Sequence, residues 1–184
     1  MKKAISAWTL SVAAAFVTFG LVPTTIWAQQ RHSVTTSVEA SETTYTQQLA
    51  IDAGDTPNHQ VRIYEIRRKH MSTPMAFRDV KVTESWSRGT SDYTDSNGQT
   101  TGYVVYNLEN GEHVFGRYTG TVQSTSRPDG TREFEYHGVT TLTGGTGLFR
   151  NIRGYFRDVT KGASKAGKAL SNAATGEGEY WFDE

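Results

Sequence analysis

The chain has 184 residues, balances 19 Lys and Arg against 19 Asp and Glu, and contains no Cys. This length corresponds to about one domain. The balanced charge argues against nucleic acid as a partner, and the lack of Cys excludes disulfide bonds, so packing and sheet closure must hold the fold together.

Residues 1–28 predict a secretory signal peptide. Two lysines near the start are followed by an uncharged stretch from residue 4 to residue 22, and Ala28 supplies the small side chain at a cut before Gln29. The alternative is a retained membrane anchor, but Ser, Thr, Gly and Pro interrupt the roughly 20 apolar residues that a span needs. No Cys follows for a lipid anchor. We therefore expect a secreted or periplasmic protein.

Residues 29–47 are polar and rich in Ser, Thr and Gln, which predicts a linker. From residue 48 onwards, short runs of β-branched and aromatic residues alternate with turn signals, a pattern typical of a β meander. We therefore expect a single all-β domain over residues 48–184.

Three turn pairs are the strongest signals in this domain: Asn97-Gly98, Asn110-Gly111 and Asp129-Gly130. Such pairs supply the positive φ angles of tight hairpins. They predict four consecutive strands, at 79–95, 100–108, 113–124 and 131–143. Further runs predict strands at 48–54, 60–69, 151–159 and 177–183.

About eight strands follow from these patterns. An open sheet of that size would expose its edges, so we expect an antiparallel, closed β-barrel in which the last strand pairs with an early one. Gly116 and Gly120 share a predicted inward face with Tyr118, as a strongly bent sheet requires. The segment 160–176 is small and polar, which predicts a loop, with a short helix near 164–172 as the alternative.

Strand 100–108 is apolar on both faces. Its outer face is therefore expected either to lie under another segment or to form an interface in a homo-oligomer.

Four motifs together resemble a known family. They are Gly-Tyr-Val-Val-Tyr at 102–106 with Glu-Asn-Gly-Glu at 109–112, Arg-Tyr-Thr-Gly at 117–120, Thr-Gly-Gly-Thr-Gly-Leu-Phe-Arg-Asn-Ile-Arg-Gly at 143–154, and Gly-Glu-Tyr-Trp at 178–181. Over residues 45–184 the chain resembles bacterial members of the allene oxide cyclase-like and dirigent-like barrel group.

This resemblance implies an eight-stranded antiparallel barrel with a central cavity. Plant relatives bind apolar, oxygenated small molecules there, as cyclases or as guides of radical coupling. No plant catalytic position matches residue by residue, so the resemblance transfers no site residue. The stretch 160–176 is an extra loop relative to the family pattern.

Glu84 is the candidate catalytic acid. It shares its parity with Val80, Val82 and Trp86, which predicts a carboxyl group on an apolar inward face. Desolvation would raise the pKa of this carboxyl and suit it to proton transfer or to binding a ligand hydroxyl. The alternative is a twist or bulge that brings Glu84 to solvent or to an Arg.

Aromatic side chains in the predicted strands are the candidate ligand-binding residues. An aromatic ring with a polar tip suits a cavity wall, although ordinary packing within strands is the alternative. The candidates are Tyr64, Trp86, Tyr106, Tyr118, Phe134 and Tyr136.

We expect neither a metal nor a cofactor. The five His residues show no metal-binding spacing, and the phosphate-loop-like motif at 162–168 is followed by Ala169 where Ser or Thr is needed. The leading hypothesis is an exported barrel that binds a small, partly apolar or aromatic molecule in its central cavity. The alternatives are a cofactor-free cyclase or isomerase in the same cavity, or a structural barrel that oligomerises without a ligand.

Overall fold

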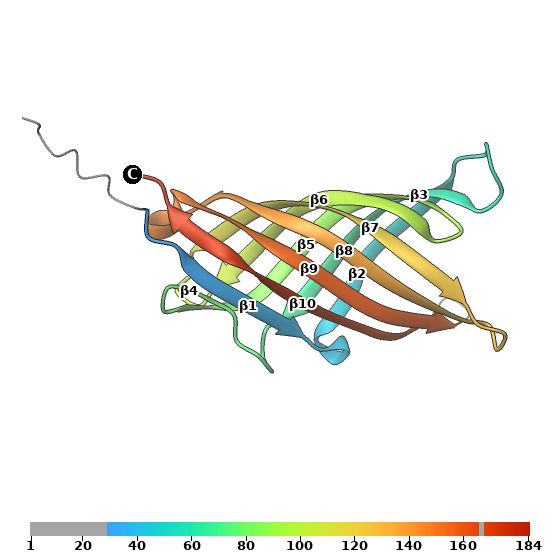
Figure 1. Ribbon diagram of the computed structural model, residues 1–184, viewed down its shortest axis with the longest axis horizontal. Helices are drawn as coiled ribbons and strands as arrows, with labels where there is room; N and C mark the ends of the chain where they lie inside the picture. The colour runs from blue at the N-terminus through green and yellow to red at the C-terminus, as the bar shows by residue number, and fades with distance from the viewer. Residues whose placement is uncertain (1–28, 166–167) are drawn as a thin grey trace, which may run out of the picture.

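The computed structural model describes residues 29–165 and 168–184. Within these ranges the protein is all-β and antiparallel, with ten strands and two short 3-10 helices (Figure 1). The predicted signal peptide lies outside the described residues. The elements are β1 (His32–Val38), η1 (Ala40–Glu42), β2 (Thr43–Asp52), β3 (His59–Lys69), β4 (Ala76–Phe77), β5 (Val80–Thr94), β6 (Asn97–Leu108), β7 (His113–Ser126), β8 (Thr131–Gly145), η2 (Gly147–Phe149), β9 (Ile152–Lys165) and β10 (Lys168–Phe182).

The strands pair in the order β1-β10-β9-β8-β7-β6-β5-β3-β2, and β4 pairs with β5. The expected hairpins are present, and Gly111 and Gly130 have the positive φ that their turns require. In the hairpin between β5 and β6, the turn residues with positive φ are Asp95 and Ser96, and the pair Asn97-Gly98 already begins β6. The Asn-Gly pair therefore predicted the hairpin correctly but placed its turn two residues too far along the chain.

The sheet does not close, so the predicted closed barrel is not what the described residues form. β1 and β2 are the two ends of the strand order and do not pair with each other. The short helix η1 connects them, and the Glu42 carboxylate accepts hydrogen bonds from the backbone N–H groups of Met71 and Ser72 at 3.1 and 2.7 Å. These bonds attach the β1–β2 connection to the segment that follows β3.

The linker predicted over residues 29–47 is wrong, because β1 and the start of β2 lie within it. β1 pairs with β10 along its whole length, from His32 opposite Tyr180 to Val38 opposite Ala174. The last strand thus does pair with an early one, as expected, and that early strand lies in the segment predicted as a linker. β1 was not predicted because its sequence is mostly polar; only Val34 and Val38 are buried among its residues.

The loop predicted over 160–176 is also wrong. β9 continues to Lys165 and β10 begins at Lys168, so the two strands extend as one long hairpin, and no helix forms in the described part of this segment. Asn172 is buried and Ala174 faces the interior. The small side chains therefore reflect a strand that must leave interior space, and not a loop.

The apolar core fills one end of the curved sheet. Its largest fully buried side chains come from β4, η2 and the start of β9, among them Phe77, Phe149, Ile152 and Phe156. The Phe77 ring meets the rings of Phe149 and Phe156 with centroids 6.4 and 6.1 Å apart. Beyond this packed end, the interior is open to the cavity described below.

Strand β6 is apolar on both faces, as expected. Val104 and Tyr106 are buried, whereas Tyr103 is 58% exposed on the outer face. Arg117 lies over the Tyr103 ring, and no described segment covers it further. Across residues 29–165 and 168–184, no helix is long and apolar enough to cross a membrane.

Candidate binding cavity

A cavity of about 620 Å³ lies inside the curved sheet. Its lining comes from β1, β2, β3, β5, β6, β7, β8, β9 and β10, so every strand of the main pairing order contributes. In Figure 1, β8, β9, β10 and β1 lie in front of β2, β3 and β5, and residues of both layers line the cavity. Its volume is in the range of ordinary small-molecule pockets.

Aromatic side chains form much of the wall. Five of the six predicted ligand-binding residues line the cavity: Tyr64, Tyr106, Tyr118, Phe134 and Tyr136. The Tyr118 hydroxyl donates to the Tyr64 hydroxyl at 2.9 Å, and the Tyr64 and Thr100 hydroxyls lie 2.6 Å apart. Burial raises the pKa of the Tyr106, Tyr118 and Tyr136 hydroxyls well above the usual value. These hydroxyls therefore remain protonated at neutral pH.

Glycines on neighbouring strands hold two of these rings in place. A Cβ atom at Gly89 or Gly102 would collide with the Tyr118 side chain, and one at Gly120 or Gly138 would collide with Tyr136. Each ring thus lies against backbone that has no side chain. This arrangement keeps the ring close to the wall and leaves interior volume for a ligand.

A polar cluster lies in the same cavity, formed by Arg68, His70 and Asp158. The Thr140 hydroxyl donates to the Asp158 carboxylate at 2.6 Å. Burial raises the pKa of Asp158, against the opposing effects of the Thr140 hydrogen bond and the Arg68 charge. The cavity therefore contains a carboxyl group that holds its proton more tightly than an exposed Asp.

His70 is buried beside this cluster. Its Nε2 lies 3.0 Å from the Ser85 hydroxyl, and its Nδ1 lies 3.5 Å from the Thr36 hydroxyl. Burial, together with the nearby Arg68 charge, lowers the pKa of His70 to about 4, against an opposing effect of Glu42. The imidazole is therefore neutral at neutral pH.

Two buried polar atoms of the cavity wall have no hydrogen-bond partner among the described residues. They are Arg68 Nε, a donor, and Asn172 Oδ1, an acceptor. Buried polar atoms in folded proteins are nearly always paired. By contrast, Arg62 in the same wall donates to Ser91 and Gln48 at 3.3 and 3.1 Å.

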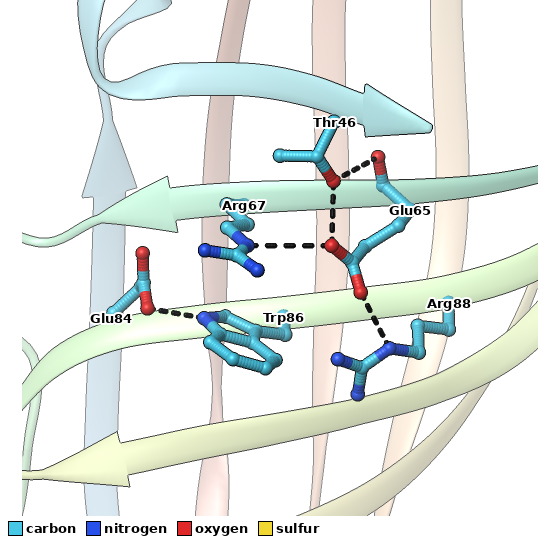
Figure 2. A network of polar contacts seen from close by, with 6 residues as sticks. All are labelled: Thr46, Glu65, Arg67, Glu84, Trp86 and Arg88. Carbon is cyan, nitrogen blue, oxygen red and sulfur yellow. Dashed lines mark hydrogen bonds and ion pairs between the residues drawn. The ribbon is translucent and has the colours of Figure 1, made fainter. Parts of the chain in front are cut away.

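Glu84 and Trp86 do not line the cavity, so their predicted inward position is wrong. A β-bulge between Val82 and Glu84 shifts the register of β5 and reverses the parity that follows. Ser85 and Ser87 face the cavity in their place. On the outer face, the Trp86 indole N–H donates to the Glu84 carboxylate (Figure 2).

The outer face of β3 and β5 carries an ion-pair network around Glu65. This carboxylate accepts from Thr46 at 2.6 Å and from Arg88 at 2.6 Å, and Arg67 approaches it at 3.3 Å (Figure 2). The Thr46 hydrogen bond and both Arg side chains lower the pKa of Glu65, against the opposing effect of burial. Arg67 and Arg88 also lie over the Trp86 ring, at 4.1 and 4.8 Å. Because its charges are paired, this network stabilises the strands.

The sequence contained a signal for the polar residues that we did not predict. Arg68 follows Tyr64 and Ile66 at spacing two along β3, and both of these are buried. Asp158 likewise alternates with the buried Phe156 and Thr160 along β9. Applying period-two parity to the charged residues as well would have placed both inside the sheet.

Comparison of the chain with protein-family models, with curated proteins and with solved structures finds no match. The resemblance to the allene oxide cyclase-like and dirigent-like group therefore stays a prediction from the motifs. Within the described residues, no three His, Cys, Asp or Glu side chains are grouped so as to hold a metal ion. A function can therefore be inferred only from the residues that line the cavity.

Proposed function

We propose that this protein binds a small, partly apolar molecule in the cavity of its curved sheet. The observation that carries the proposal is a cavity of about 620 Å³ with an aromatic wall and with buried polar atoms that have no partner among the described residues. An interior that served stability alone would be filled to close-packed density and would leave few such atoms. A ligand with an apolar body and polar oxygen atoms complements both features.

The proposal includes an exported protein of the allene oxide cyclase-like barrel type. The signal-peptide pattern of residues 1–28 supports secretion or a periplasmic location. The antiparallel order and the η1 connection between the two edge strands support a nearly closed barrel. No cofactor is needed for binding of this kind.

Asp158 favours a second candidate function, a cofactor-free isomerase or cyclase. Burial raises the pKa of the Asp158 carboxyl inside the cavity, and a carboxyl group with a raised pKa suits a general acid. Asp158 takes over the role for which we considered Glu84. In such a reaction Asp158 would donate a proton to a ligand oxygen and take one back from another ligand atom as the bonds rearrange, so the product would have the same mass as the substrate.

The test is to recover the natural occupant. The protein is exported from cells, analysed by native mass spectrometry and then extracted for chromatography. We expect a bound small molecule in the wild type and its loss in Ser87→Trp, which fills the cavity from β5. The matched control is Thr90→Trp, which adds the same ring to an exposed position on the same strand.

The outcomes separate the candidates. If folded wild-type protein carries no small molecule, or if Ser87→Trp retains it, binding in the cavity is wrong. Asp158→Asn distinguishes the two functions. A binding protein retains the same compound, whereas an isomerase accumulates a compound of equal mass and different retention time.

A further inference from the structure

The charges that face the cavity are unequal. Three guanidinium groups line it, from Arg62, Arg68 and Arg132, against the single carboxyl group of Asp158. Arg62 is hydrogen-bonded to Ser91 and Gln48 and lies over three tyrosine rings. Arg132 donates to the Ser96 hydroxyl. Arg62 and Arg132 thus have hydrogen-bond partners, whereas no partner of Arg68 is found among the described residues.

The Arg68 charge acts on the nearby Asp158 carboxyl, but Arg68 forms no ion pair among the described residues. Its side chain makes no hydrogen bond or ion pair there, and its Nε is buried. Asp158 is hydrogen-bonded to Thr140 instead, and His70 is neutral at neutral pH. The Arg68 side chain is half-buried and its guanidinium group is always protonated; a charge partly removed from solvent without a partner is costly. Residues kept at such a cost are typical of binding sites.

We propose that the ligand of this cavity is an organic anion whose carboxylate is bound by Arg68. This inference rests on the proposed function and names the class of ligand. A guanidinium group matches the two oxygens of a carboxylate with two parallel hydrogen bonds. The Arg68 guanidinium makes no hydrogen bond to a described residue and so can bind a carboxylate, and the rings of Tyr64, Tyr106 and Tyr118 receive an apolar or aromatic body.

The test uses two probes with the same ring system: naphthoate, which is an anion, and its methyl ester, which is neutral. Calorimetry measures the dissociation constant of each with the mature protein. We expect naphthoate to bind the wild type at least about tenfold more tightly than the ester, as one charge-assisted hydrogen-bond pair implies. Arg68→Gln should remove this preference and leave the affinity for the ester unchanged.

Two further variants complete the design. Arg68→Lys keeps the charge but loses the two-pronged geometry, so a weakened preference for naphthoate should remain; it also carries the test if Arg68→Gln does not fold. Arg117→Gln changes an Arg on the outer face, over Tyr103, and should alter neither constant.

The results distinguish this inference from the proposed function. If both probes bind equally well and Arg68→Gln changes neither constant, the inference is wrong and binding in the cavity stands. If naphthoate is preferred but Arg68→Gln retains the preference, Arg68 is not the anion site and the inference is again wrong. If neither probe binds, both the inference and the proposed function are contradicted.

Discussion

At the scale of single residues, the chemistry of the interior depends on which side chains alternate inward. Tyr64, Ile66 and Arg68 follow a regular period of two along β3, and all three line the cavity. One inserted residue between Val82 and Glu84 breaks the same rule in β5. A bulge moves every later side chain to the other face, so the acid of the interior is Asp158 and not Glu84.

Replacing His70 tests the interior electrostatics. Its pKa is lowered to about 4 in the folded protein, from an ordinary value of 6.5. The unfolded chain therefore binds the proton first as the pH falls, so stability should decline between pH 6.5 and 4 and change no further from this residue below pH 4. The loss is up to about 3 kcal/mol.

Urea unfolding across this pH range measures the effect. His70→Asn should flatten the profile between pH 6.5 and 4. His137→Asn, which changes an exposed His on β8, should leave the slope as in the wild type. An unchanged slope in His70→Asn would show that the imidazole is not buried in the neutral form.

At the scale of elements, the strands are shaped by pairs of a ring and a glycine. Gly120 on β7 and Gly138 on β8 are paired directly, and the Tyr136 ring lies against both. Such pairs let a sheet curve strongly and still present an aromatic wall. The shape of the cavity therefore depends on these glycines as much as on the tyrosines that line it.

Gly120→Ala should displace the Tyr136 ring. The added Cβ would collide with that ring and with the backbone oxygen of His137, and overpacking of this kind costs about 1–3 kcal/mol. Thermal unfolding and the near-ultraviolet circular dichroism of tyrosine report the change. Thr119→Ala, at an exposed position on the same strand, is the control and should alter neither signal.

At the scale of the whole molecule, the cavity exists because one sheet curves until its two edges approach. β1 is one of these edges, and it covers the edge of β10 through pairing along seven residues. Exposed strand edges promote association. The segment predicted as a linker is therefore a structural part of the cavity wall.

Removing residues 29–38 should destabilise the protein by about 3 kcal/mol or more, because the burial of Val34 and Val38 and the pairing of β1 are lost together. The uncovered edge of β10 should also promote aggregation. Light scattering and thermal unfolding measure both effects. Removing residues 29–31 alone, which precede β1, should have little effect; equal behaviour of the two truncations would contradict a structural role for β1.

Turn pairs and period-two alternation are local properties of the chain, and they were enough to predict the all-β class, most strand positions and five aromatic residues of the cavity wall. It did not reveal β1, whose strand character depends on pairing with β10 more than 100 residues away in the chain. Only the tertiary structure decided that the sheet ends open between β1 and β2, and that a bulge turns Glu84 outward. The tertiary structure also places the Arg68 guanidinium in the cavity without a partner among the described residues. The sequence could not predict this, because the neighbours of a charged group come from strands that are distant in the chain.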